Sequence, residues 1–438
     1  MKNELRLESR RRFLMRASGG IGGLAFQAML TREAARAGEA HGPLAPKQPH
    51  FAARASRVIF LNMDGGPSAQ ETFNPKPDRS LFQFNQHGQA GLPVSELFPH
   101  LARHTEKLCL LHGMHSDSPD HINAAIQLHC GKHLSSRPSM GSWVTYGLGN
   151  ENENLPGFIT LNPSSKGAGA KLYGNAFIPA IYAGTPIDQS LELSDARNEL
   201  MNRPEQRALL DRVQLRNRNL LQRHERDSHL NGLLNAYELA FKMQSALPEL
   251  LDVRRESRRV LDAYGVGKQA TDAFARQCLA ARRMSEAGVR FIELPHGTWD
   301  HHSSIGKLLP QRCAEIDQPI AALLEDLSQR GLLDETLILW GGEFGRTKTE
   351  KDKRDGGSGH NNKGYTMWLA GGGVKGGFAH GQTDEEGWEA IEGRVHIHDL
   401  HATMLHQLGL DHERLTYRYA GRDFRLTDVH GKLVREII

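Results

Sequence analysis

The chain has 438 residues, of which 39% are hydrophobic and 24% charged, which is ordinary for a globular protein with a large apolar core. The formal net charge is +3 with basic and acidic residues mixed along the sequence, so there is no basic stripe and no nucleic-acid partner is expected. Beyond the first 40 residues no apolar run is long enough to span a bilayer, and we expect no membrane span in the mature protein.

Residues 1–40 have the order and composition of a twin-arginine export signal. Ser9-Arg10-Arg11-Arg12-Phe13-Leu14 precedes a mildly apolar, glycine-rich segment and then an alanine-rich stretch. The alternative is a basic amphipathic helix, which glycine at this density disfavours. We therefore predict export to the periplasm or outside the cell, and one folded domain over residues 50–438.

The domain is predicted to begin with a buried strand, Arg57 to Leu61, followed by Asp64-Gly65-Gly66. In open α/β sheets the carboxyl ends of strands are where ligands bind, so Asp64 is a candidate metal ligand. The alternative is turn chemistry, since Asp before Gly is a common turn signal.

A second strand is predicted from Leu108 to Leu111, and a helix from Ile122 to Cys130 with Ser118-Pro119 as its cap. A helix amino terminus at the sheet edge favours anions. His121 and Lys132 are therefore candidates to contact a charged ester group, with surface or capping roles as the alternative.

The segment 190–287 is predicted to be a helical insertion that serves as scaffold or lid, because apolar residues recur near helical spacing among arginines and glutamines. The expected helices are Pro204–Arg226, His229–Ser245, Glu256–Tyr264 and Thr271–Glu286.

A strand from Val289 to Leu294 is followed by a glycine-containing loop with Asp300 and His302. Carboxylate and imidazole are ligands that Zn and Mn accept, although the two residues could equally form a hydrogen-bonded structural pair.

The stretch from Thr336 to Gly377 organises the prediction. A strand from Thr336 to Trp340 leads to Glu343, and a polar loop leads to His360 before a strand from Tyr365 to Ala370. This order predicts Glu343 and His360 at the carboxyl ends of two neighbouring strands. The glycines at 371–373 lack the order of a nucleotide-binding loop and indicate a turn.

Nearer the carboxyl terminus, Asp399 is predicted to cap a helix that ends at Leu408, and residues 415–438 to form a short hairpin. The four cysteines show no metal-binding spacing and are interpreted as buried free thiols, although export would permit one pairing.

Taken together, several motifs resemble the family of unknown function DUF1501, which is abundant in planctomycete-type bacteria. The motifs are Arg137–Gly147, Gly342–Thr347, Leu369–Gly377 and His398–Thr403. The resemblance implies membership of the alkaline phosphatase and sulfatase superfamily, with a central mostly parallel sheet, helices on both faces and one or two divalent metal ions such as Zn, Mn or Ca.

The resemblance implies that Asp64, Asp300, His302, Glu343 and His360 hold the metal. It places Phe344 at a lost ligand position and His121 at the position of the superfamily's nucleophile, which is ordinarily Cys, Ser or Thr. Relatives also carry polar residues where Ala69 and Gly359 stand.

Two hypotheses follow. The first is a metal-dependent hydrolase of a small anionic ester or a sulfated or phosphorylated glycan, with His121 as acid, base or extra ligand and Arg346 and Lys132 gripping the anion. The second is a non-catalytic binding or assembly protein on the same fold, favoured by Phe344 and by the missing hydroxyl nucleophile.

Overall fold

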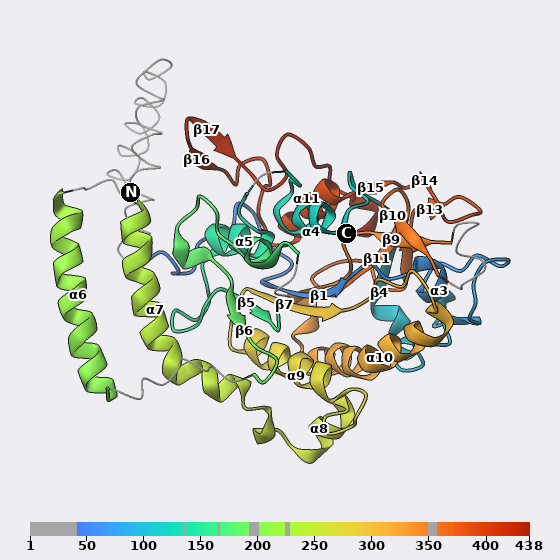
Figure 1. Ribbon diagram of the computed structural model, residues 1–438, viewed down its shortest axis with the longest axis horizontal. Helices are drawn as coiled ribbons and strands as arrows, with labels where there is room; N and C mark the ends of the chain where they lie inside the picture. The colour runs from blue at the N-terminus through green and yellow to red at the C-terminus, as the bar shows by residue number, and fades with distance from the viewer. Residues whose placement is uncertain (1–41, 135, 164–166, 192–200, 224–227, 349–356) are drawn as a thin grey trace, which may run out of the picture.

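The computed structural model describes residues 42–134, 136–163, 167–191, 201–223, 228–348 and 357–438. The predicted export signal lies outside the described residues. A nine-stranded sheet crosses the molecule, with helices on both of its faces (Figure 1). The α/β architecture predicted from the sequence is confirmed.

The strand order is β12-β4-β11-β8-β1-β7-β5-β6, and β15 pairs with β4. The strands are β1 Arg57–Asp64, β4 Leu108–His115, β5 Phe158–Leu161, β6 Thr185–Ile187, β7 Phe291–Gly297, β8 Thr336–Gly341, β11 Tyr365–Ala370, β12 Phe378–His380 and β15 Val395–His396. β11 runs antiparallel to β4 and β8, and the other pairings are parallel. The amino end of β11 therefore lies at the same edge as the carboxyl ends of β8 and β1.

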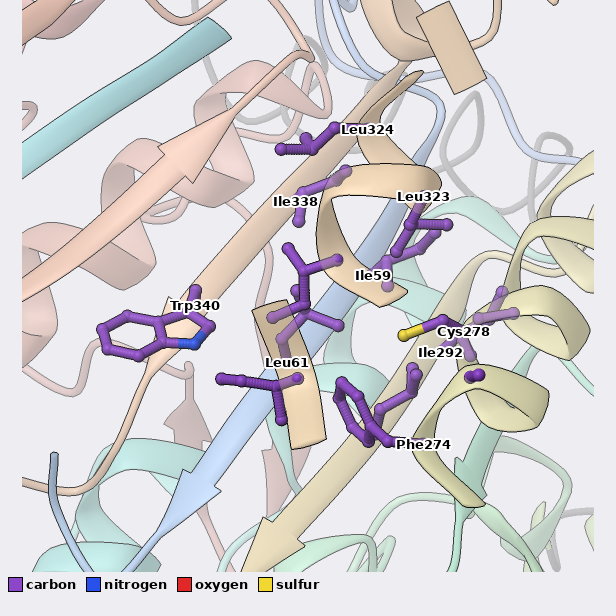
Figure 2. Packing of buried hydrophobic residues seen from close by; sticks show 14 of the residues in the cluster. Ile59, Leu61, Phe274, Cys278, Ile292, Leu323, Leu324, Ile338 and Trp340 are labelled. Atoms are coloured by element: carbon purple, nitrogen blue, oxygen red, sulfur yellow. The ribbon is translucent and has the colours of Figure 1, made fainter. Parts of the chain in front are cut away.

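Alternation along β1 divides the core into two layers. Ile59 and Leu61 belong to the layer covered by α9 (Asp272–Glu286) and α10 (Ile305–Gln329), and Figure 2 shows Cys278 and Leu323 of these helices in that layer. Val58 and Phe60 belong to the opposite layer, which α4, α5 and α11 cover. These three helices are α4 His121–Cys130, α5 Met140–Leu148 and α11 Ile397–Gln407. Both faces are apolar, which explains why the strands read as continuous hydrophobic runs.

The helical segment predicted for 190–287 contains both peripheral and core helices. α6 (Arg203–Arg223) and α7 (Ser228–Leu251) pack against each other at the margin of the molecule, and α8 (Arg258–Tyr264) leads into α9 beneath the sheet (Figure 1). In the described part of the chain, no helix combines the length and apolar character needed to cross a membrane. All four cysteines are buried and free, as predicted.

Short elements complete the structure. They are α3 Ala69–Thr72, β2 Phe84–His87, β3 Leu92–Ser95, β9 Gly345–Thr347, β10 Gly359–Asn361, β13 Gln382–Thr383, β14 Ala390–Glu392, β16 Tyr417–Tyr419 and β17 Arg422–Phe424. The hairpin predicted near the carboxyl terminus is formed by β16 and β17.

Two predicted helix caps are wrong. α4 is capped by Asp120 rather than Ser118, because the Asp120 side chain accepts the Asn123 N–H at 3.0 Å. α11 begins before Asp399 and is capped by His396, whose Nδ1 accepts the His398 N–H at 3.2 Å. Asp399 lies in the first turn and accepts the His396 N–H at 3.0 Å, which completes a reciprocal cap.

Candidate metal centre

Four segments meet at the carboxyl edge of the sheet. They are the loop after β7, the first residue of α4, the loop after β8 and the two-stranded ribbon of β9 and β10. His360 lies in β10 opposite Arg346 of β9. The prediction that His360 follows a strand of the main sheet is wrong, because it precedes β11 and β11 runs antiparallel to β8. It still reaches the expected edge.

These segments bring His121, Asp300, His302 and His360 together, with one ligand-type atom from each within 4.8 Å of the others. The Asp300 Oδ1 atom lies 3.0 Å from His302 Nε2, 3.3 Å from His121 Nε2 and 3.5 Å from His360 Nε2. The two Nε2 atoms of His302 and His360 are 3.0 Å apart. One carboxylate oxygen is thus surrounded by three imidazole nitrogens.

A backbone contact sets the tautomer of His360. Its Nδ1 lies 2.7 Å from the Pro119 carbonyl oxygen, which can only accept, so Nδ1 carries the proton. The lone pair is therefore on Nε2, which faces the cluster. Orienting an imidazole through its other nitrogen is the usual outer-shell arrangement at protein metal sites. Several imidazoles with one carboxylate suit Zn or Mn better than Ca, which prefers oxygen ligands throughout.

His121 is held on its other side by Glu343. The His121 Nδ1 atom lies 2.6 Å from Glu343 Oε1, and the Gly65 N–H donates to both oxygens of Glu343 at 3.1 and 3.2 Å. The carboxylate is 2% exposed, and its hydrogen bond raises the pKa of His121. The ring is further confined by Phe344 and His360, with centroids at 4.8 and 4.3 Å. Its Nε2 is buried and makes no hydrogen bond, although Asp300 is near.

Arg346 fixes the site from below. Its buried guanidinium donates to the carbonyl oxygens of Gly65, Gly66 and Ser358, and it pairs with Asp300. Burial alone would raise the pKa of Asp300, but Arg346 and the neighbouring histidines hold that pKa below its usual range. Arg346 was predicted to grip a substrate anion; its contacts here instead hold Asp300 and the turn after β1.

Two predicted residues lie apart from the cluster. Lys132 follows the far end of α4, roughly 15 Å along the helix axis from His121, and its amino group is 4.0 Å from Asp428. Asp64 ends β1 as predicted and is partly buried, and burial together with Glu343 raises its pKa. The structure therefore gathers Asp300, His302 and His360 of the five predicted ligands, adds His121, and directs Glu343 to His121.

The family assignment follows from the match of the sequence to a family model. The model described as "Protein of unknown function (DUF1501)" covers residues 55–438. The chain belongs to the DUF1501 family. No curated protein matches the sequence.

Several solved structures are similar to this DUF1501 chain at low identity. The lipoteichoic acid synthase LtaP from Listeria monocytogenes is 9% identical, with a TM-score of 0.42 over 90% of this chain and 79% of that one. The alkaline phosphatase from the Antarctic bacterium TAB5 is 15% identical, with a TM-score of 0.34 over 75% and 93%. The phosphonate monoester hydrolase SpPMH from Silicibacter pomeroyi is 10% identical, with a TM-score of 0.37 over 81% and 73%.

The sequence analysis missed a buried ion pair beside the site of the DUF1501 chain. His129 Nε2 lies 2.8 Å from Glu293 Oε1, which also accepts from Asn62 at 3.1 Å, and both members of the pair are 2% exposed. A signal for it exists, because Glu293 stands inside an apolar strand and a buried carboxylate needs a partner. The contacts from Gly65 and Pro119 have no such signal, since any residue offers a backbone group.

Proposed function

We propose that this protein is an exported, divalent-cation-dependent hydrolase of phosphate- or sulfate-type esters, acting on a small anionic ester or a phosphorylated or sulfated glycan. The observation that carries the proposal is the convergence of His302 and His360 on Asp300 with the lone pair of His360 directed inward. The two Nε2 atoms lie at hydrogen-bond distance, but only one of them can supply a proton, so a shared cation satisfies them better than each other.

Asp300, His302 and His360 are the proposed ligands. When bound, a divalent cation there supplies Lewis-acid polarisation of an ester oxygen and offsets the charge that develops on it. Arg346 keeps Asp300 ionised and aimed at the cluster through their ion pair. This arrangement is rigid, because the guanidinium is also bound to three backbone carbonyls.

His121 is the proposed catalytic imidazole, facing the ligands from the first residue of α4. Glu343 holds the proton at Nδ1 and leaves Nε2 directed toward Asp300. Because Phe344 and His360 pack on the ring, His121 is confined before a substrate arrives. The anion-favouring end of the α4 dipole lies at the same place.

Phe344 favours a second function, a non-catalytic binding or assembly protein. Its side chain is fully buried and its ring stacks on His360 at 4.6 Å, so one side of the cluster is closed by an apolar group where a further ligand could have stood. A screen with aryl sulfates, phosphate monoesters and phosphate diesters in the presence of Zn²⁺ or Mn²⁺ separates the two functions. Turnover that is lost in Asp300→Ala eliminates the non-catalytic function.

The hydrolase proposal is tested on the purified full chain. We expect about one equivalent of Zn²⁺ or Mn²⁺ after dialysis, and a reduction of roughly 10-fold or more in metal affinity for His360→Gln. His87→Gln, in the β2–β3 hairpin, is the matched control and should bind metal normally. A wild-type protein that binds no divalent ion at micromolar concentration would contradict the proposal.

The proposed export rests on the twin arginines at the start of the sequence. A fusion of residues 1–50 to a reporter that is active only after export in the folded state tests it. Export should require the Tat translocase, and export that persists without that translocase would contradict this route.

A further inference from the structure

We propose that His121 is a nucleophile whose Nε2 accepts a phosphoryl group from a phosphate monoester, forming a transient phosphohistidine. The inference rests on the proposed hydrolase function and deepens it, because it assigns phosphate monoesters as the substrate class and divides the reaction into two steps.

The first support is the fixed tautomer of His121. A neutral imidazole carries one proton, and an ionised carboxylate can only accept one. With Glu343 Oε1 at 2.6 Å from Nδ1, the proton is on Nδ1 and the lone pair is on Nε2. The Nε2 atom is buried and makes no hydrogen bond, so the protein itself does not use this lone pair.

The second support is the set of groups around the His121 ring. Its contacts within the described part of the chain are with Glu343, Asp300, Phe344 and His360, and none of these offers a hydroxyl or thiol. His121 therefore has no side-chain nucleophile to deprotonate. In contrast to a serine–histidine pair, the imidazole nitrogen is itself the nucleophilic atom of this arrangement.

The third support is the electrostatic setting. Nε2 lies 3.3 Å from the Asp300 oxygen at the centre of the proposed cation site, so a phosphoryl group held by that cation would meet the lone pair at short range. His121 is the first residue of a ten-residue helix whose positive end favours a dianion. Phosphorylation makes the ring cationic, and the buried Glu343 carboxylate lies against it to offset that charge.

The two steps balance as follows. The Nε2 electron pair forms an N–P bond while the bond from phosphorus to the ester oxygen breaks, and the departing alkoxide takes a proton from solvent to leave as the alcohol. Water then attacks phosphorus, the N–P electron pair returns to Nε2, and inorganic phosphate leaves after the water loses a proton. No oxidant or further reactant is needed.

Rapid quench into alkali, with p-nitrophenyl phosphate as the probe and the Mn²⁺- or Zn²⁺-loaded full chain, tests the inference. We expect an alkali-stable, acid-labile phosphoryl adduct on the peptide that contains His121. His121→Asn, whose amide can still donate to Glu343, should lose the adduct and about 10³-fold of the turnover while it retains metal. His87→Asn is the control and should form the adduct normally.

A second variant, His121→Gly with added imidazole, separates nucleophile from base. A nucleophilic role predicts rescued turnover with N-phosphoimidazole as an intermediate product, and rescue without that product contradicts it. Turnover of a chiral phosphate ester with inversion and without any adduct would overturn the covalent step but leave the hydrolase standing. Absence of both turnover and metal binding would remove the hydrolase, and the covalent step with it.

Discussion

Glu343→Gln isolates the contact that orients His121. Glutamine has nearly the same shape and keeps one oxygen for the Gly65 N–H, but its amide N–H would oppose the proton on His121 Nδ1. To avoid two facing donors, the imidazole must move its proton to Nε2, which removes the lone pair from the cluster. The bond lost is charge-assisted and 2.6 Å long, and a bond of that kind is worth about 1.5–3 kcal/mol.

If that energy is expressed in the transition state, kcat/KM falls about 10- to 150-fold, since 1.36 kcal/mol corresponds to tenfold. The assay compares kcat/KM for p-nitrophenyl phosphate with metal content by mass spectrometry, in wild type and in Glu343→Gln. Bound metal should be unchanged, because Glu343 lies outside the four-residue cluster. A kcat/KM within twofold of wild type, or a parallel loss of metal, would refute the reasoning; the latter would make Glu343 a ligand.

Three further predictions concern stability and export. Burial lowers the pKa of His401 to about 3, below its unfolded value of about 6.5, so stability present above pH 6.5 is lost as the pH falls toward 3; His401→Gln should flatten this dependence by about 2 kcal/mol between pH 7 and pH 5 in urea unfolding. Gly131→Ala should cost about 1–3 kcal/mol by the same assay, because Gly131 has a φ of 70° and an added Cβ would meet the Leu426 carbonyl oxygen; unchanged stability would contradict this. Arg10→Lys with Arg11→Lys should retain the protein in the cytoplasm, as measured by cell fractionation.

Much of the sheet could be predicted because both of its faces are buried. Continuous apolar runs predicted β1, β8 and β11, and the bounds of β11 match those predicted, Tyr365 to Ala370. The direction of β11 could not be predicted, since strand direction depends on long-range pairing rather than on local sequence. The helix α10 received no prediction, and its internal Pro310 and Pro319 are residues that ordinarily interrupt a helical pattern.

The same division applies to the site. Asp300, His302 and His360 were recognisable as ligand-type residues in polar segments beside predicted strands. The partner of Glu343 was not predictable, because a carboxylate at that edge can turn either to a cation or to His121, and the Gly65 N–H and His121 that hold it are distant in sequence. The role of Arg346 was missed for the same reason: its acceptors are backbone carbonyls that only the folded chain brings together.

The most direct test of the cation site is the metal content of purified Asp300→Asn beside wild type and His87→Gln. The asparagine retains the shape of Asp300 but removes the charge that His121, His302 and His360 surround. The site predicts about one divalent ion per chain in wild type and in the control, and a loss of roughly 10- to 100-fold in affinity for Asp300→Asn. Equal metal content in all three proteins, or none in wild type, would contradict it.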